Sequence, residues 1–481
     1  MSLPLNDWLP SDLVRLACRL EEEGHWSFVA GHVVRDALVR QSADDGAPPC
    51  PVSEPAGSGI CRSGVSVDRG PTASLIVPRE AASWIGELRQ PWSSTNHQIK
   101  FHLVDNVEQF IASQSFTIEA IAWSPAGERL VDPVGGAEDL VHGRTLRCVT
   151  EPCRAFKEDP SRILRAYRLL ATHDLELEAE TARGMVSSIE RLSTLEAPQV
   201  RDELLRMMEE VPAGQGRMIR AFRLMEAQGF LALALPELLP CRGVTQPPEF
   251  HRHDVLDHLY YSADCTDRHV PLHRLGMLLH DIGKPESRQE EAGRITFIGH
   301  ENTGARIADQ LLRRLDFAPE DRDTVVELVQ YHMRLHDFWA FGDRGLRRLR
   351  DKLQHLSLED LVYVRFWDRL GAGMQSKSST EKARDDMLNR LDRLRSEPEI
   401  RKEASPALAV DGRILMETLG VPGGKGMGEV IRRLEAVVAE SPELNHEASL
   451  LEMAQEFFEM GQRDGQRGHI GERGVFGKVN P

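Results

Sequence analysis

The chain has 481 residues and a formal net charge of −16, so RNA or DNA could bind only through a local basic surface. Its seven cysteines are scattered without a CxxC pair, which argues against a disulfide framework or a cysteine-rich zinc site. The first residues lack the basic start and apolar core of a secretory signal, and no apolar run reaches about 18 residues. We therefore expect a cytoplasmic protein that does not span a membrane.

The first 150 residues or so mix predicted helices and strands. Leucines recur at helical spacing across residues 8–23, and a short strand turns at Gly31 into a second helix. The stretch 41–72 is rich in Gly, Pro, Ser and Asp, which predicts a long loop or insertion. Further strands are expected at 73–78, 99–104 and 115–123, and as a strand–turn–strand unit within 127–149.

From Asp159 onward the pattern becomes helical. Asp159 is a good N-cap and Pro160 suits the first helical position. The last residues lack apolar periodicity, so 463–481 is expected to be a disordered tail. The fold class is therefore α+β: a small mixed α/β head followed by a long all-helical body. The expected helices are 178–191, 197–210, 216–229, 254–267, 271–281, 300–315, 320–335, 358–371, 379–396, 425–439 and 446–461.

Metal-ligand residue types recur within the apolar helices of the middle of the chain. They are His258, His280, Asp281, His300, His332 and Asp368. An unpaired polar group among apolar residues is costly, and a shared metal centre removes that cost. Two divalent ions could use the whole set, with Asp281 as a bridging carboxylate. Lys284 lies four residues after His280, on the same helix face, and could hold a substrate phosphate.

For any single histidine, an ordinary core or surface position is the simpler interpretation, and only the whole set in this order favours a metal centre. Nickel, manganese, iron, cobalt or magnesium ions are compatible with such ligands. The remaining histidines of the region are interpreted as bystanders: His251, His253, His269, His273 and His336.

The order His, His-Asp, His, His, Asp, with "HDIGKP" and "GHE", resembles the HD superfamily of metal-dependent phosphohydrolases over roughly residues 250 to 372. The resemblance implies that His258, His280, Asp281 and Asp368 form the minimal ligand set of the superfamily. It implies His300 and His332 as the additional ligands of two-metal members. Asp281 and Lys284 are then the expected catalytic residues.

The rest of the chain resembles the CCA-adding enzymes and bacterial poly(A) polymerases. The motifs are "GHVVRDAL", "SFTIEAIAWSPAGERLVDPVGGAEDL", "FKEDPSRILRAYRLLA" and a C-terminal segment containing "PELN". The resemblance implies that Asp159 and Arg162 read the base of an incoming nucleotide, with Arg35, Asp36 and Arg165 also at the nucleotide. The alternative is a plain helix start with solvated arginines. Arg162, Arg165 and Arg168 are spaced by threes and could form a local basic strip for RNA or a nucleotide phosphate. The implied domains are a head (1–150, with the 41–72 insertion), a neck and body (151–245), an HD domain (246–375), a C-terminal helical region (376–462) and the tail (463–481).

Departures from that family concentrate in the head. The family holds two Mg²⁺ ions with an Asp-x-Asp pair on a strand after a Gly-Gly turn. Here the turn is Gly31-His32, the strand-like "GVSVDRG" offers Asp68 alone, and "IKFHLV" offers Lys100 and His102. Four polar positions also differ from the family's charged pattern: Ser113, Gln114, Ser115 and Glu119. These differences predict an inactive head.

The expected function is therefore a metal-dependent phosphohydrolase of the HD type, with an inactive transferase-like head. Its expected substrate is a cyclic phosphodiester, a nucleotide or an RNA 3′ end. The first alternative is an active CCA-adding or poly(A) nucleotidyltransferase. The second is a non-enzymatic RNA- or nucleotide-binding protein. The expected partner is a nucleotide or a tRNA-like RNA. No contact with a membrane is expected, and the oligomeric state stays open.

Overall fold

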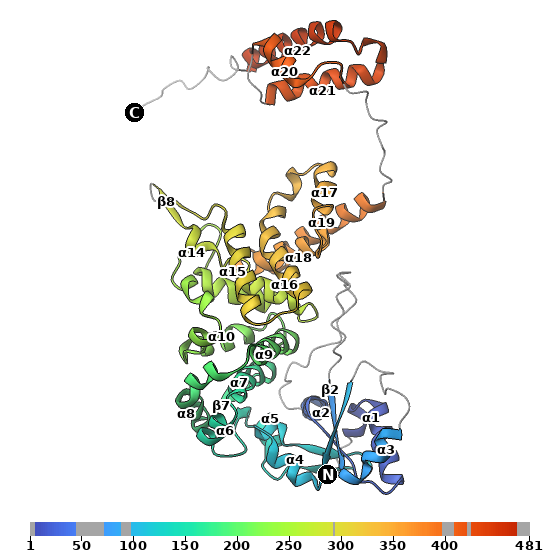
Figure 1. Cartoon of the computed structure of the whole chain (residues 1–481), viewed down its shortest axis with the longest axis vertical. Coiled ribbons are helices and arrows are strands. Elements are labelled where there is room, and N and C mark those ends of the chain that lie inside the picture. The colour runs from blue at the N-terminus through green and yellow to red at the C-terminus, as the bar shows by residue number, and fades with distance from the viewer. Residues whose placement is uncertain are drawn as a thin grey trace, which may run out of the picture. The chain divides into compact units, whose positions relative to one another are not determined.

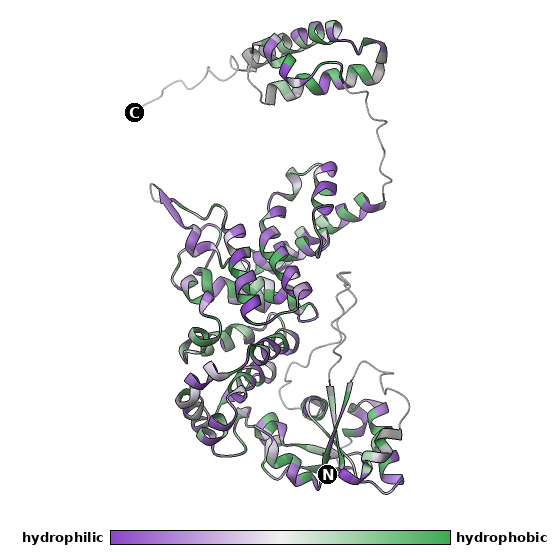
Figure 2. Ribbon diagram, in the orientation of Figure 1, coloured by the Kyte–Doolittle hydropathy of each residue, from purple (hydrophilic) through white to green (hydrophobic). Residues whose placement is uncertain are grey.

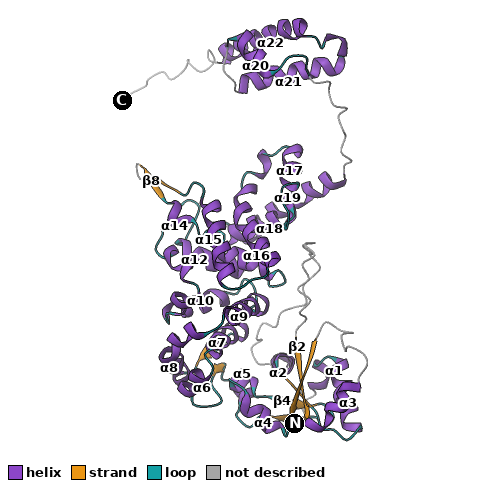
Figure 3. Ribbon diagram, in the orientation of Figure 1, coloured by secondary structure: helices purple, strands orange, loops and turns teal. Residues whose placement is uncertain are grey.

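The computed structural model describes residues 5–44, 72–87, 98–291, 294–396, 408–420 and 425–468. The chain divides into two compact units, Met1–Asp392 and Arg393–Pro481 (Figure 1). Figure 3 shows that the strands gather in the head, with two short pairs elsewhere, and that helices make up the rest. No helix within the described ranges is long and apolar enough to cross a membrane.

The head is built on a five-stranded sheet with the order β3-β2-β1-β4-β5. Strand β2 runs parallel to β3 and antiparallel to β1, and β4 is antiparallel to both β1 and β5. The strands are β1 (Phe28–Ala30), β2 (Thr72–Pro78), β3 (Gln98–Val104), β4 (Ala122–Ser124) and β5 (Arg129–Val131). The helices are η1 (Leu5–Trp8), α1 (Ser11–Glu22), α2 (His32–Asp44), η2 (Arg79–Ala81), α3 (Ala82–Glu87), α4 (Val107–Ser113), η3 (Thr117–Glu119) and α5 (Gly136–Val141).

Alternating side chains give this sheet two apolar faces. Val29 and Leu75 belong to the core that also contains the leucines of α1. Phe28 and Ile76 point to the opposite face, where they join Phe110 of α4 in a smaller cluster. Successive strand residues alternate between faces, which explains this division. The central strands are correspondingly hydrophobic in Figure 2.

Two expectations for the head were wrong. The segment 115–123 is not one strand, because Thr117–Glu119 forms the turn η3 before β4 begins. The strand–turn–strand unit expected within 127–149 contains helix α5. The carboxylate of Asp132 accepts hydrogen bonds from the backbone N–H groups of Gly136 and Ala137 and so caps that helix. Most of the insertion expected at 41–72 lies outside the described residues, although α2 continues to Asp44 and β2 begins at Thr72.

The neck is a helical layer in which α7 packs against α9 and α10. The short strands β6 (Thr145–Leu146) and β7 (Glu176–Leu177) pair in parallel beside it. The helices are α6 (Pro152–Glu158), α7 (Ser161–His173), α8 (Ala179–Ser188), η4 (Ile189–Thr194), α9 (Ala197–Glu210), α10 (Arg217–Ala227), α11 (Phe230–Ala234) and η5 (Pro236–Cys241). Helix α6 precedes the predicted start of the helical region, because Pro152 and the capping side chain of Glu151 begin it earlier.

The middle region packs α12 against α13 and α18, and α15 against α16. Close backbone approach at Gly371 of α18 makes this packing possible, since a Cβ there would lie 2.2 Å from Ser262 Oγ on α12. The elements are α12 (Val255–Cys265), α13 (Pro271–Leu279), α14 (Lys284–Ser287), β8 (Gln289–Glu291), β9 (Arg294–Thr296), α15 (His300–Arg314), α16 (Pro319–Tyr331), η6 (His332–Leu335), η7 (Phe338–Ala340), α17 (Asp343–Arg350), α18 (Leu358–Ala372) and α19 (Lys377–Ser396).

The C-terminal unit has a small core of its own. Val410, Leu415, Leu434, Val438 and Leu450 are buried together. Helix α22 continues to Gly468, into the segment expected to form a tail, and residues 469–481 lie outside the described residues. The elements are α20 (Gly412–Leu419), α21 (Lys425–Glu440), η8 (Pro442–Leu444) and α22 (Glu447–Gly468).

Candidate functional site

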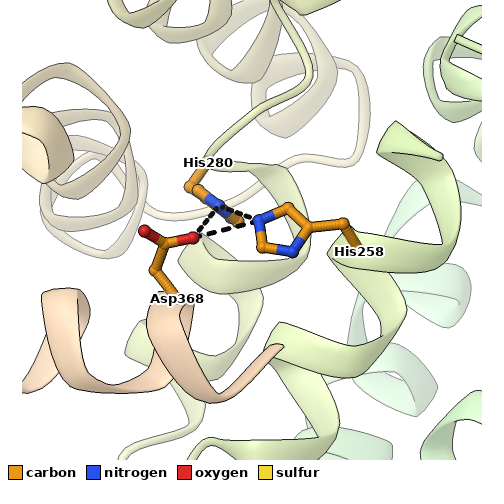
Figure 4. Close-up of side chains that lie close together, drawn as sticks. All are labelled: His258, His280 and Asp368. Carbon is orange, nitrogen blue, oxygen red and sulfur yellow. Dashed lines mark hydrogen bonds and ion pairs between the residues drawn. The ribbon is translucent and has the colours of Figure 1, made fainter. Parts of the chain in front are cut away.

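The six predicted metal-ligand residues converge in space and form two groups of three. In the first group, His258 Nε2 lies 3.0 Å from Asp368 Oδ1 and 3.1 Å from His280 Nε2, and His280 Nε2 lies 3.4 Å from the same carboxylate oxygen (Figure 4). The three side chains come from α12, from the end of α13 and from α18. All are buried, so the cluster lies where packed helices meet.

The second group contains His300, His332 and Asp281. His300 Nε2 is 3.1 Å from Asp281 Oδ1 and 3.2 Å from His332 Nε2. The other oxygen of Asp281, Oδ2, lies 3.4 Å from the Nε2 atoms of both His258 and His280. Asp281 therefore faces both groups with different oxygens, which is the geometry of a bridging carboxylate.

Backbone carbonyls orient three of the four imidazoles. The Nδ1 atoms of His280, His300 and His332 lie 2.7–2.8 Å from carbonyl oxygens three residues earlier in the chain. A carbonyl only accepts, so each Nδ1 carries a hydrogen, and in the neutral ring the lone pair of Nε2 faces the cluster. That is the form in which histidine binds a metal ion.

Glycine in "HDIGK" allows the chain to turn tightly beside the cluster. A Cβ on Gly283 would lie 2.2 Å from the carbonyl oxygen of His300 and 2.4 Å from the amide nitrogen of Gly304. Only the absence of a side chain lets this turn rest on the first turn of α15. The contact brings His280 and Asp281 against His300.

Lys284 is buried and lies inside the cluster. Its Nζ is 2.5 Å from Asp281 Oδ2 and donates a hydrogen bond to Gln246 Oε1 at 2.6 Å. Burial opposes ionisation of Asp281, but the Lys284 ammonium and the His280 imidazole outweigh it and hold the pKa of that carboxyl well below its usual range. Asp281 is thus an anion, as a bridging ligand must be. The catalytic roles expected for Asp281 and Lys284 remain predictions.

A cavity of about 480 Å³ opens above the cluster. Its lining combines ligand-type residues with apolar side chains such as Phe250 and Ile298. Two histidines interpreted as bystanders also line it. His336 Nε2 lies 3.4 Å from Asp368 Oδ2, and the ring of His251 lies edge-on to His258. The spacing of His336, four residues after His332, was a signal that could have identified it.

The donor set fits divalent transition-metal ions. Each group combines imidazole nitrogens with a carboxylate oxygen, and its ligand atoms all lie within 4.8 Å of one another. Such mixed nitrogen and oxygen donors suit transition-metal ions better than calcium, which prefers all-oxygen sites. Paired ions of this kind clamp the oxygens of a bound phosphate.

In the neck, the structure brings Asp159 and Arg162 together. Arg162 Nε lies 3.6 Å from Asp159 Oδ2, while Asp159 Oδ1 accepts hydrogen bonds from the amide and hydroxyl of Ser161. Arg162 Nε has no hydrogen-bond partner among the described residues although it is buried. Arg162 therefore keeps a hydrogen-bond donor that none of the described neighbouring residues accepts.

The arginines of α7 do not form the basic strip that their spacing suggests. Arg168 is buried and forms ion pairs with Glu203 at 2.8 Å and with Glu210, both on α9. Arg165 Nη1 approaches Ser115 Oγ at 3.4 Å, and its Nε lies 3.9 Å from Glu203. Acidic residues of α9 thus neutralise this face, and the expectation of a free basic strip here was wrong.

Arg35 and Asp36 lie at the start of α2, with different surroundings. Arg35 is buried, and its Nε has no partner among the described residues. Burial lowers the pKa of Arg35, and the opposite charge of Glu119 counteracts this shift. Burial raises the pKa of Asp36, and the opposite charge of Arg35 counteracts that shift. Their expected contact with a nucleotide stays a prediction.

The head face beside Gly31 does not provide a magnesium site among the described residues. Gly31 has φ +87°, and Ser74 of β2 lies next to it, opposite Ala30. Ser74 Oγ is 3.2 Å from His102 Nε2 on β3. Strands β2 and β3 contain no Asp or Glu, whereas Mg²⁺ is bound through carboxylates. Asp68, the candidate from sequence, lies outside the described residues.

Known proteins match this chain along most of its length. The family model described as "HD domain" matches residues 254–372. The A-adding tRNA nucleotidyltransferase of Deinococcus radiodurans is 32% identical over 423 residues, which cover 84% of this chain and 90% of that protein. The chain belongs to the tRNA nucleotidyltransferase family. It also contains an HD domain, and both predicted resemblances are confirmed.

Other relatives of the family agree with this assignment. The Multifunctional CCA protein of Paracidovorax citrulli is 35% identical over 261 residues, covering 52% of this chain and 59% of that protein. The crystal structure of the Bacillus stearothermophilus CCA-adding enzyme in complex with CTP aligns over 97% of this chain and 99% of that chain, with a TM-score of 0.50 and 16% identity. The latter shows a shared fold and confirms the predicted class of a small mixed head on a helical body.

The predicted function of an HD-type phosphohydrolase with an inactive head was wrong. The relative that covers 84% of this chain is named as a tRNA nucleotidyltransferase, and another relative is named as a CCA protein, which supports the transferase alternative. The prediction gave most weight to the intact ligand cluster. A ligand cluster identifies a place where ions could bind, and it does not identify the reaction of the whole chain.

Proposed function

We propose that the protein is a tRNA nucleotidyltransferase that adds a nucleotide, most simply AMP, to the 3′ end of tRNA. The observation that carries the proposal is the 32% identity to the A-adding tRNA nucleotidyltransferase of Deinococcus radiodurans across 84% of this chain. In the reaction, the 3′ hydroxyl oxygen of the RNA bonds to the α-phosphorus of ATP, and pyrophosphate leaves. Such an activity operates in the cytoplasm.

The neck supplies the groups for base recognition in this proposal. Asp159 and Arg162 lie side by side at the start of α7, and Arg162 retains an unpartnered donor. A carboxylate beside a guanidinium offers acceptors and donors together, which suits the edge of a nucleobase. Arg165, Arg35 and Asp36 are proposed to lie around the same nucleotide. No step is assigned to a metal ion in the head, since β2 and β3 provide no carboxylate.

Incorporation of labelled nucleotides tests the proposal directly. The full-length protein is incubated with ATP or CTP, Mg²⁺ and tRNA transcripts that lack one, two or three 3′ nucleotides. We expect labelled AMP on the transcript that lacks only its last nucleotide. If no nucleotide is added to any transcript, the transferase proposal fails.

We also propose that the HD domain binds two divalent transition-metal ions. His258, His280 and Asp368 would hold one ion and His300 and His332 the other, with Asp281 available to both groups. The proposal is supported by the orientation of the imidazoles and by the two oxygens of Asp281 facing different groups. Metal analysis by mass spectrometry of the purified protein should give two ions per chain, and a metal-free protein after growth with nickel, manganese, iron and cobalt would contradict it.

A further inference from the structure

A protein of this net charge needs a local basic surface to hold RNA, and α7 does not provide it. The arginines of that helix face Asp159, Glu203 and Glu210. A different helix, α17, carries the sequence "DRGLRRLR" and places most of its arginines towards solvent. This helix was not predicted, because it is short and contains Gly345, which has low helix propensity.

A small hollow lies between α17 and the end of α16. Its volume is about 160 Å³, and it is lined by Tyr331, Arg334, Phe341, Gly345, Arg348, Leu349 and Lys352. The hollow owes its shape to Gly345, since a Cβ there would lie 3.1 Å from the Phe341 ring. Two aromatic rings and three cationic side chains therefore share one concave surface.

The cations of the hollow are not neutralised by the protein. Among the described residues, no carboxylate lies within ion-pair distance of Arg334, Arg348 or Lys352, and no acidic residue lines the hollow. The two acids of the adjoining segment are occupied elsewhere: Asp343 pairs with Arg390 at 3.0 Å, and Asp351 pairs with Arg350 at 2.8 Å. Three like charges facing one hollow repel each other, and an anion relieves that repulsion.

Several features favour RNA as the anion. Arg348 and Arg344 lie four residues apart on one face of α17, so the positive surface extends beyond the hollow along a line, as a chain of phosphates requires. Phe341 adds a ring surface on which an unpaired base can stack, while the Arg334 guanidinium already lies over the Tyr331 ring, 6.0 Å from its centroid. Trp339, two residues before Phe341, is 61% exposed and offers a further ring.

We infer that the α17 hollow is a docking site for the sugar-phosphate backbone of RNA. Resting on the proposed function, that RNA is the tRNA substrate. The site is separate from the nucleotide-reading pair Asp159 and Arg162, and it holds the substrate without taking part in the transfer. It adjoins the HD cavity, because η6 contributes Met333 to that cavity and is the element that carries Arg334 into the hollow.

Binding measurements on a matched pair of variants test this inference. Arg348→Gln/Lys352→Gln removes two cations from the hollow. Arg306→Gln/Arg313→Gln removes two cations from exposed ion pairs of α15, so the two variants have the same net charge. Fluorescence anisotropy with labelled tRNA lacking its last nucleotide gives Kd at several salt concentrations. Circular dichroism confirms that both variants are folded.

The hollow variant should bind tRNA roughly tenfold more weakly at about 0.15 M salt, and the slope of log K against log salt should fall by about 2. The α15 variant should keep the Kd and slope of the parent protein. Equal Kd values and slopes for all three proteins would overturn the inference, as would a parent protein that does not bind tRNA. Displacement of tRNA by polyglutamate as readily as by unlabelled RNA would also overturn it, in favour of an acidic protein partner.

A separate readout distinguishes this inference from the proposed function. Nucleotide addition is measured for both variants at saturating tRNA. There the hollow variant should react at the rate of the parent protein, because the defect lies in docking. Weaker tRNA binding by the hollow variant, together with a parent protein that binds tRNA but adds no nucleotide, would support the docking site while removing the transferase proposal. Normal nucleotide addition together with unchanged tRNA binding in the hollow variant would support the transferase proposal and remove the docking site.

Discussion

In the HD domain, the side chains form the cluster that the family resemblance predicts. In the head, the described side chains do not form the magnesium site that its family would need. In the HD domain, six ligand-type side chains from distant segments meet within two compact groups. In the head, the strands beside the Gly31 turn present Ser74 and His102 where a magnesium site would need acids. Yet the relative whose match covers 84% of this chain is named for nucleotide addition. A complete cluster of ligand-type side chains therefore does not by itself identify the reaction of a chain.

The largest effect is expected at the residue shared by both metal groups. Asp281→Asn keeps the shape of the side chain but removes its charge and one ligating oxygen. Both ions should then bind at least about 100-fold more weakly, since ligand and supporting groups act together. Metal content measured after gel filtration should fall from two ions per chain to below one. His269→Gln, which removes an exposed imidazole of the same region, is the control and should retain both ions.

The ion pairs of α7 are expected to matter for stability. Arg168→Gln removes the nearest ion-pair partner of the largely buried Glu203, which should lower the free energy of unfolding by about 3–5 kcal/mol. Arg154→Gln, which breaks an exposed pair with Glu158 on α6, should have no measurable effect. Urea denaturation compares the two variants, and equal midpoints would show that the buried pairs do not hold the neck together.

Base recognition in the neck should depend on Arg162. Arg162→Ala removes a charged donor from the proposed nucleotide site, a loss that corresponds to roughly 10- to 100-fold in kcat/KM for nucleotide addition. Discrimination between ATP and CTP should weaken at the same time, because the lost contacts are directed at the base. A variant that adds nucleotides with the selectivity of the parent protein would exclude Arg162 from this role.

The smallest effect concerns the packing between α12 and α18, which carry two of the three residues of the first metal group. Gly371→Ala places a Cβ against Ser262, where it meets backbone as well as the hydroxyl. Overpacking of this kind should lower stability by about 1–3 kcal/mol and separate His258 from Asp368 slightly. Thermal denaturation measures the first effect, and a lower metal content than in the parent protein measures the second. Unchanged values for both would mean that α12 and α18 pack less closely there.

Much of the site could be predicted from sequence, because His258 and Asp368 lie on helices with buried apolar faces. The other ligands lie at or directly after helix ends. Convergence of His258 with Asp368, 110 positions later, follows once those buried faces pack together. The position of His251 could not be predicted in this way, and His336 had only its spacing from His332 as a signal. Neither residue lies within an apolar helix. Both lie in connecting segments, and the path of those segments depends on the packing of the whole domain.

The fold shows the same limit. Helices with long apolar stripes were predicted, while α5 and α17 were missed because a side-chain cap and a few leucines hold them in place. The arginines of α7 look solvated in sequence, and only the packing of α9 shows that Glu203 and Glu210 meet Arg168. Charge compensation between distant helices has no signature in local spacing, so it was this part of the prediction that failed.

One experiment separates the two regions most directly. Single-nucleotide addition to tRNA is measured side by side for the parent protein, for Arg162→Ala and for the double variant His258→Ala/Asp368→Ala, with metal content determined on the same samples. The account predicts that Arg162→Ala loses most of the addition activity while keeping its metal ions, and that the double variant loses metal while still adding nucleotides. Addition that disappears with the metal ions and survives the loss of Arg162 would contradict it.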